Sequence, residues 1–206
     1  MNLSTGSVRS TLLLLAVFCG GCVTLERSYP ADQRYFMIEA QDGKTPSSEG
    51  TDILSVHNLY ISPRYADRNF IYRTSETEYE TDFYNQFLSA PATMISEEVR
   101  QALAAARLFK VVLGPSNPLP ANYVLEGSIN VLYGDFRNLR APAAVLEIEF
   151  LLHNEDPTQN KIVMQKRYRR SIPLSERTPE ALVKGWNQAL AEIITMFVTD
   201  LNQRKL

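Results

Sequence analysis

The stretch Tyr123–Tyr133 reads YVLEGSINVLY, and its alternation is the observation on which the fold prediction rests. Successive side chains of a β-strand point to opposite faces of the sheet. The alternation predicts a half-buried strand whose core face consists of Tyr123, Leu125, Gly127, Ile129, Val131 and Tyr133. The polar residues Glu126, Ser128 and Asn130 fall on the opposite face, as expected where a sheet meets water on one side.

Two further alternating stretches follow in the chain. Val145–His153 places four large apolar residues on one face and Glu147 and Glu149 on the other, and Ile162–Ile172 returns after a turn-rich loop. We therefore expect an antiparallel hairpin. Its second strand carries cations that we expect to pair across the sheet with the two glutamates, at roughly 0.2–1 kcal/mol per pair. These cations are Lys166, Arg167, Arg169 and Arg170.

Two helices are predicted from the three- and four-residue spacing of apolar side chains. The first covers residues 91–108, with Pro91 in its first turn and an apolar face of Ile95, Val99, Ala102, Leu103 and Ala106. The second starts at the capping residue Thr178, followed by Pro179 and Glu180. Its buried stripe is predicted to be Leu182, Trp186, Leu190, Ile193, Phe197 and Leu201.

The remaining segments predict short strands at residues 35–39, 53–61, 69–73 and 109–113. A strand, a helix and a strand in succession indicate one crossover and a locally parallel pair. Residues 74–89 mix aromatic and acidic side chains and fit a strand, an irregular lid or the approach to a helix, with rings that cover the core edge. The predicted fold class is α+β, a mainly antiparallel or mixed β-sheet with two long helices packed on one face.

The N-terminal stretch Leu12–Cys22 reads LLLLAVFCGGC and resembles a bacterial lipoprotein signal. Its apolar run of about 11 residues is shorter than the about 20 residues a membrane-spanning helix needs. We expect cleavage before Cys22 and a diacylglycerol on its thiol, which divides the chain into a signal peptide (1–21), a tether (22–34) and a domain (35–206). An ordinary secretory signal and a buried core segment are the alternatives.

Composition limits the classes of function. Removing residues 1–21 removes one charged side chain, Arg9, and leaves 20 basic and 23 acidic residues, a net charge of −3. This balance does not indicate nucleic-acid binding. Both cysteines lie at the signal, so a chain acylated at Cys22 would have no free thiol, no disulfide and no cysteine metal site. No other apolar run approaches membrane length.

The sequence contains none of the catalytic motifs considered below. His57 and His153 are far apart and fit no metal-ligand spacing, and no phosphate-binding loop or nucleophile elbow occurs. Glu147 and Glu149 face the same way on one strand, whereas a glycosidase needs carboxylates on opposite sides of a sugar. We expect no enzymatic activity, no metal, and no cofactor except a covalent lipid on Cys22.

Several segments together carry a family resemblance: YADRNFIYRTSE (65–76), YETDFYNQF (79–87), YVLEG (123–127), LYGDF (132–136) and GWNQAL (185–190). In order and spacing they resemble the ABC-type transport auxiliary lipoproteins, the PqiC-like family. The resemblance implies a periplasm-facing lipoprotein that serves an ABC permease and ATPase together with an MCE-domain protein, in lipid traffic between membranes. Val23 after the cysteine favours the outer membrane by resemblance to enterobacterial sorting.

The leading hypothesis is a docking and tethering subunit that meets the MCE-domain protein. Aromatic residues and arginine carry most interface energy, so the candidate interface residues are Tyr72, Arg73, Tyr79, Phe83 and Tyr84. A symmetric homo-oligomer is a further hypothesis. Two alternatives stay open: a lipid-carrying domain with its own apolar cavity, and a structural envelope lipoprotein without a transport role.

Overall fold

A computed structural model describes residues 32–40, 50–155 and 161–204. The predicted signal peptide and most of the predicted tether, including Cys22, lie outside the described residues. Most of the loop predicted after residue 40 lies outside them as well.

The described chain forms a mixed nine-stranded sheet and two long helices, which confirms the α+β prediction. Five strands precede the first helix, where the sequence indicated three. In chain order the elements are β1 (Arg34–Phe36), β2 (Ile53–Val56), β3 (Tyr60–Ile61), the short 3-10 turn η1 (Pro63–Tyr65), β4 (Asn69–Arg73), β5 (Tyr79–Phe87), α1 (Pro91–Ala106), β6 (Val111–Leu113), β7 (Tyr123–Asp135), β8 (Ala143–Asn154), β9 (Ile162–Pro173) and α2 (Pro179–Gln203).

The single strand predicted over 53–61 is two strands, β2 and β3, separated by three residues. Between them the Leu59 backbone N–H donates to Ser96 Oγ on α1 at 2.9 Å, and the Leu59 side chain is buried. The chain leaves the ladder at this point because it packs against the helix. Residues 79–87, which the sequence left open, form strand β5.

The long strand β7 organises the sheet. It pairs antiparallel with β8 along one edge, and its other edge pairs in parallel with β2, β3 and β4. The strand that follows α1, β6, pairs in parallel with β2 and not with β5, the strand immediately before the helix. The predicted parallel pairing therefore exists, but it joins strands that are farther apart in the chain.

A bulge in β7 changes the predicted faces of that strand. Ile129 lies opposite Ile148 and Val131 opposite Glu147, so Asn130 is the additional residue. An additional residue reverses the alternation beyond it. Val131 and Tyr133 consequently lie on the face without helices and not on the predicted face, although Tyr133 is buried there beside Tyr65 and Tyr79. Leu132, opposite Leu146, is buried on the face that carries the helices.

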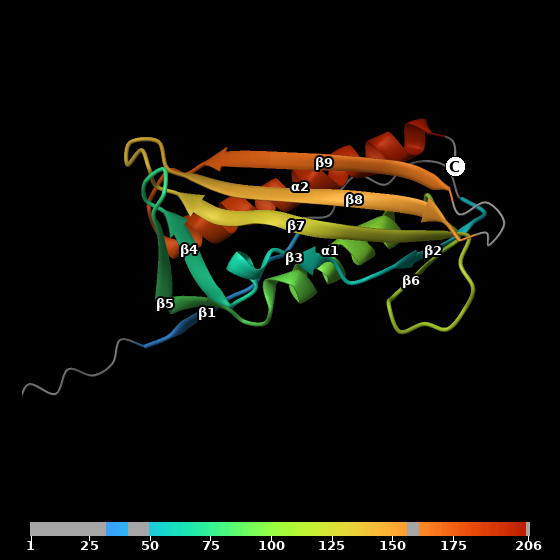
Figure 1. Ribbon diagram of the computed structural model, residues 1–206, viewed down its shortest axis with the longest axis horizontal. Coiled ribbons are helices and arrows are strands. Elements are labelled where there is room, and N and C mark those ends of the chain that lie inside the picture. Colours follow the sequence, from blue (N-terminus) through green and yellow to red (C-terminus); the bar gives the residue numbers. More distant parts are fainter. Residues whose placement is uncertain (1–31, 41–49, 156–160, 205–206) are drawn as a thin grey trace, which may run out of the picture. The chain divides into compact units, whose positions relative to one another are not determined.

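Both helices pack on the same face of the sheet (Figure 1). The Thr178 side chain accepts a hydrogen bond of 3.2 Å from the Ala181 backbone N–H, which confirms the predicted cap of α2. All six residues of the predicted α2 stripe are fully buried. Helix α1 ends at Ala106, two residues before the predicted end, because Arg107 adopts a left-handed conformation with φ of 53°.

Among the described residues, aromatic rings pack between the sheet and the helices. Phe70 packs edge-on against Trp186 at 5.1 Å between ring centroids and lies 4.7 Å from Phe87. Phe150 on β8 stacks on Phe197 of α2 at 4.3 Å. Close packing of this kind leaves little room for a lipid chain among these residues.

The predicted ion pairs of the β8–β9 hairpin form only in part. Arg167 contacts Glu149 at 2.7 Å and Arg169 contacts Glu147 at 3.0 Å on the helix-free face, as predicted. The prediction was wrong for the two other cations. Lys166 and Arg170 point to the helix side and pair with Asp200 and Glu192 of α2, because successive residues of a strand alternate between its faces.

Candidate docking surface

The candidate surface is built around a wide bulge in β5. Asn69 of β4 lies opposite Gln86, whereas the next residue, Phe70, lies opposite Asp82. Residues 83–85 are therefore left out of the ladder. Phe83 and Tyr84 protrude from it, and 66% and 55% of their respective surfaces are exposed.

The Asp82 carboxylate holds this bulge in shape. Its Oδ1 accepts the backbone N–H groups of Tyr84 at 2.9 Å and Asn85 at 3.1 Å. Its Oδ2 accepts the Asn85 side-chain amide at 2.7 Å and the Tyr72 hydroxyl at 2.8 Å. One carboxylate thus satisfies four donors, and the two protruding rings project from a braced backbone rather than from a loose loop.

The Tyr72–Asp82 contact shifts the pKa values of both groups. Burial raises the pKa of the Tyr72 phenol, and its hydrogen bond to the Asp82 carboxylate raises it further, so the phenol remains a donor. Burial alone would raise the pKa of Asp82. The hydrogen bonds from Asn85, Tyr72 and the backbone outweigh burial and lower that pKa, which keeps the carboxylate charged.

Tyr72 has different neighbours from Arg73 and Tyr79, because successive residues of β4 point to opposite faces of the sheet. The Tyr72 ring stacks on Phe136 at 4.9 Å, and the Tyr79 ring packs edge-on against Tyr133 at 5.8 Å. The Arg73 guanidinium lies 5.7 Å from the centre of the Tyr79 ring.

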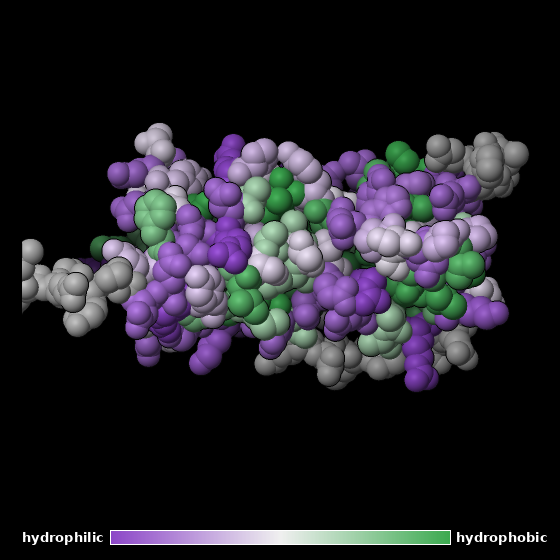
Figure 2. All heavy atoms as spheres, turned by 90° about the horizontal axis from the view of Figure 1, so that it is seen from below, coloured by the Kyte–Doolittle hydropathy of each residue, from purple (hydrophilic) through white to green (hydrophobic). Residues whose placement is uncertain are grey.

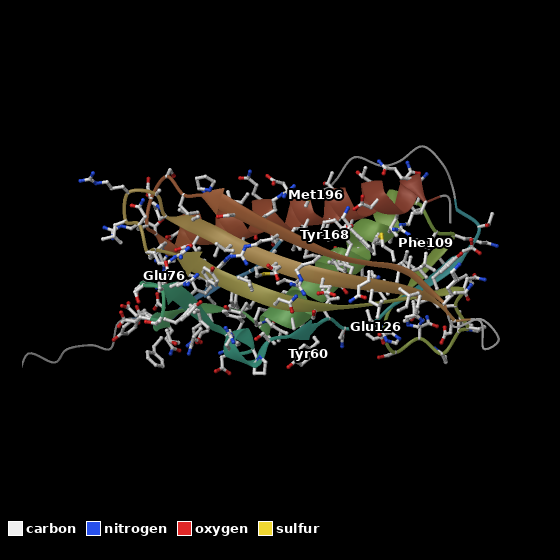
Figure 3. The ribbon with its side chains drawn as sticks, turned by 45° about the horizontal axis from the view of Figure 1, so that its top comes forward. Tyr60, Glu76, Phe109, Glu126, Tyr168 and Met196 are labelled. Carbon is white, nitrogen blue, oxygen red and sulfur yellow. The ribbon has the colours of Figure 1, made fainter. Side chains whose placement is uncertain are left out.

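Arg73 also ties down the turn between β4 and β5. It donates to the backbone oxygen of Ser75 at 3.2 Å and to the Glu76 carboxylate at 3.0 Å. The Glu76 carboxylate also accepts a hydrogen bond of 2.6 Å from the Arg137 guanidinium. Figure 3 shows Glu76 at this end of the sheet. Of the five predicted residues, Tyr72 therefore helps to hold the bulge through Asp82, whereas Phe83 and Tyr84 protrude from it. Arg73 and Tyr79 lie beside the β4–β5 turn, where Tyr79 is 41% exposed.

Sequence reasoning missed the contribution of β1 to this surface. Tyr35 and Leu88 are about half exposed, and the Arg68 guanidinium lies over the Tyr35 ring at 5.6 Å while donating to Leu88 O at 3.1 Å. The parallel pairing of β1 with β5 brings Tyr35 opposite Gln86, next to the bulge. We call Tyr35, Phe83, Tyr84 and Leu88 the β1–β5 surface.

One face of the molecule shows how apolar and polar side chains are distributed. Seen from below the view of Figure 1, apolar residues form several patches separated by polar side chains (Figure 2). Among the described residues, no three His, Cys, Asp or Glu side chains are placed to hold a metal ion. In the same part of the chain, no helix is both long enough and apolar enough to cross a membrane.

Comparison with solved structures establishes the fold. A Xanthomonas campestris protein of family DUF330 superimposes with a TM-score of 0.72 at 15% identity, covering 83% of this chain and 98% of its own. A second crystal structure, of an uncharacterized protein, matches with a TM-score of 0.64 at 16% identity, covering 82% and 98% of the two chains. This chain shares their fold.

The sequence places the chain in a family. The sequence model of the ABC-type transport auxiliary lipoprotein component matches residues 35–196. The chain therefore belongs to this family of ABC-type transport auxiliary lipoproteins, to which the DUF330 proteins also belong. The family is a component of transport systems and is not a known family of enzymes. No curated protein matches the chain.

Proposed function

We propose that the chain is the docking and tethering subunit of an ABC/MCE-type system linked to lipid traffic between membranes. In this proposal a lipid on Cys22 anchors the domain to the periplasmic side of the outer membrane. Family membership supports the transport role. The LLLLAVFCGGC stretch supports the anchor, since two or more acyl chains hold a protein firmly at a membrane.

The observation that carries the docking role is the braced bulge of β5. Exposed aromatic rings on a rigid backbone bind a partner at low entropic cost, because little order is lost on association. Phe83 and Tyr84 are the proposed contact residues for the MCE-domain protein, and Tyr72 helps to hold them in place through Asp82. Arg73 and Tyr79, beside the β4–β5 turn, are further candidate contacts. The aromatic packing of the core supports docking over lipid carriage.

A photo-crosslinking amino acid at position 83 or 84, introduced in cells that contain the whole transport system, tests this proposal. The same amino acid at the exposed Tyr60, on β3, is the matched control. We expect an adduct with the MCE-domain protein from positions 83 and 84 and none from position 60. Adducts with other envelope proteins only, or equal adducts from all three positions, would contradict the proposal.

A further inference from the structure

Strand β9 forms an open edge of the sheet. Within the described chain it pairs with β8 alone. The Leu174 backbone N–H donates to Pro142 O at 2.8 Å, so residue 174 directs its backbone groups toward β8. Because backbone groups alternate along a strand, the even-numbered residues of β9 that precede it also bond to β8. The odd-numbered residues from Gln165 to Ser171 direct their N–H and C=O groups outward.

A long hollow runs between this edge and helix α2. It consists of two adjoining depressions of about 670 and about 550 Å³ that share Arg170, Thr195 and Met196. Figure 3 shows Tyr168 on β9 and Met196 on α2 along this side of the molecule. The hollow offers space beside β9 for the side chains of one more strand.

Charges on the helix-free face of this edge are arranged with cations outermost. The side chains of Arg167 and Arg169 are 61% and 47% exposed, while their partners Glu147 and Glu149 are 13% and 20% exposed. On the helix-free face, a ligand that approaches this edge therefore meets guanidinium groups before carboxylates.

Charge disfavours the pairing of this edge with a second copy of the chain in the register centred on Tyr168. Antiparallel pairing of two β9 strands about Tyr168 would set Arg167 of one copy opposite Arg169 of the other. Like charges directly opposite each other destabilise a strand pair, whereas opposite charges stabilise it. The same two arginines therefore favour a strand that carries acidic residues.

We propose that the β9 edge binds an extended acidic segment of a partner polypeptide, which joins the sheet as an additional strand. Acidic residues at alternate positions of the segment lie beside Arg167 and Arg169, and the uncharged residues between them face the hollow at Met196. Backbone N–H groups of the segment replace the Arg170 guanidinium, which now donates to Arg169 O at 3.2 Å. This mode of recognition is β-strand addition, and it is independent of the docking role of β5.

The test uses the full chain and two fluorescein-labelled peptides, VEVEVEVE and VKVKVKVK, in fluorescence anisotropy titrations at low ionic strength. We expect the acidic peptide to bind and the basic peptide not to bind. Arg167→Glu with Arg169→Glu weakens binding of the acidic peptide by about tenfold or more. The matched control, Lys110→Glu with Arg140→Glu, changes two exposed cations elsewhere and retains binding.

A second variant separates strand addition from simple charge attraction. Gln165→Pro removes one outward N–H group, keeps every cation, and leaves the β8 ladder intact because residue 165 bonds to the open edge. We expect it to abolish binding while circular dichroism stays unchanged. No binding of VEVEVEVE to the unmodified chain, equal binding of both peptides, or binding retained in Gln165→Pro would each overturn the proposal. A β9-dependent dimer in sedimentation would overturn it in favour of a second copy.

Discussion

The hydroxyl of Tyr72 donates a hydrogen bond of 2.8 Å to Oδ2 of Asp82, across the antiparallel pair β4–β5. Through this contact the half-buried Tyr72 of β4 holds the Asp82 carboxylate, which shapes the bulge in β5. The protruding position of Phe83 and Tyr84 therefore depends on a residue that itself presents little to solvent.

Removing the Tyr72 hydroxyl should loosen the bulge. We expect Tyr72→Phe to lower the free energy of unfolding by about 1–3 kcal/mol, since a hydrogen bond to a charged group is lost while the ring stack on Phe136 remains. Urea denaturation measures this change, with Tyr60→Phe as the exposed control. An unchanged midpoint in Tyr72→Phe would show that the contact contributes nothing.

The stability contributed by Asp82 should depend on pH. Because its folded pKa is lowered, its contribution is present above the unfolded pKa of about 3.9 and is lost as the pH falls through the folded pKa. We expect Asp82→Asn to be less stable than the unmodified chain at pH 7, and the difference to shrink below about pH 4. Urea midpoints across this pH range test it, and a difference that grows with acidity would contradict the assignment.

The two exposed rings should contribute to docking and not to folding. We expect Phe83→Ser with Tyr84→Ser to change the free energy of unfolding by less than about 0.5 kcal/mol, because both rings lie largely in solvent. Capture of the MCE-domain protein should be lost at the same time. A double variant that folds normally and retains capture would exclude these residues from the interface.

Gly127 marks a close approach between strands and core. A Cβ there would lie 2.6 Å from Glu149 O and 2.9 Å from a methyl group of Leu59, whereas a Cβ at Gly114 would lie 3.7 Å from Arg100. We expect Gly127→Ala to destabilise the domain by about 1–3 kcal/mol and Gly114→Ala to have little effect. Thermal unfolding of the two variants side by side measures the difference, and equal melting temperatures would contradict it.

Local periodicity predicted the elements whose burial repeats without interruption. The β8–β9 hairpin and the α2 stripe from Leu182 to Leu201 are confirmed because each buried residue recurs at the period of its own element. The faces of β7 were predicted correctly only as far as Ile129. A bulge residue such as Asn130 cannot be recognised in an alternating sequence. Its position depends on how β7 pairs with the partner strand β8.

The sequence predicted which segment forms the candidate surface, but not how the side chains of that segment are arranged. Its aromatic and acidic residues were visible in the sequence, yet the separation into bracing and protruding side chains depends on the bulge beside Asp82. The role of Tyr35 depends on parallel pairing with residues about fifty positions later, which no local pattern specifies. The different partners of Arg170 and Arg169 follow from strand alternation together with the position of α2.

Intact-mass spectrometry of the exported protein shows whether Cys22 carries the lipid on which the proposed tethering role depends. We expect a chain that begins at Cys22 and carries the mass of a diacylglycerol, recovered with the outer membrane, while Cys22→Ser remains unacylated. An exported chain that begins at residue 22 without acyl mass, or a chain that keeps residues 1–21 and stays in the cytosol, would contradict the proposed anchor.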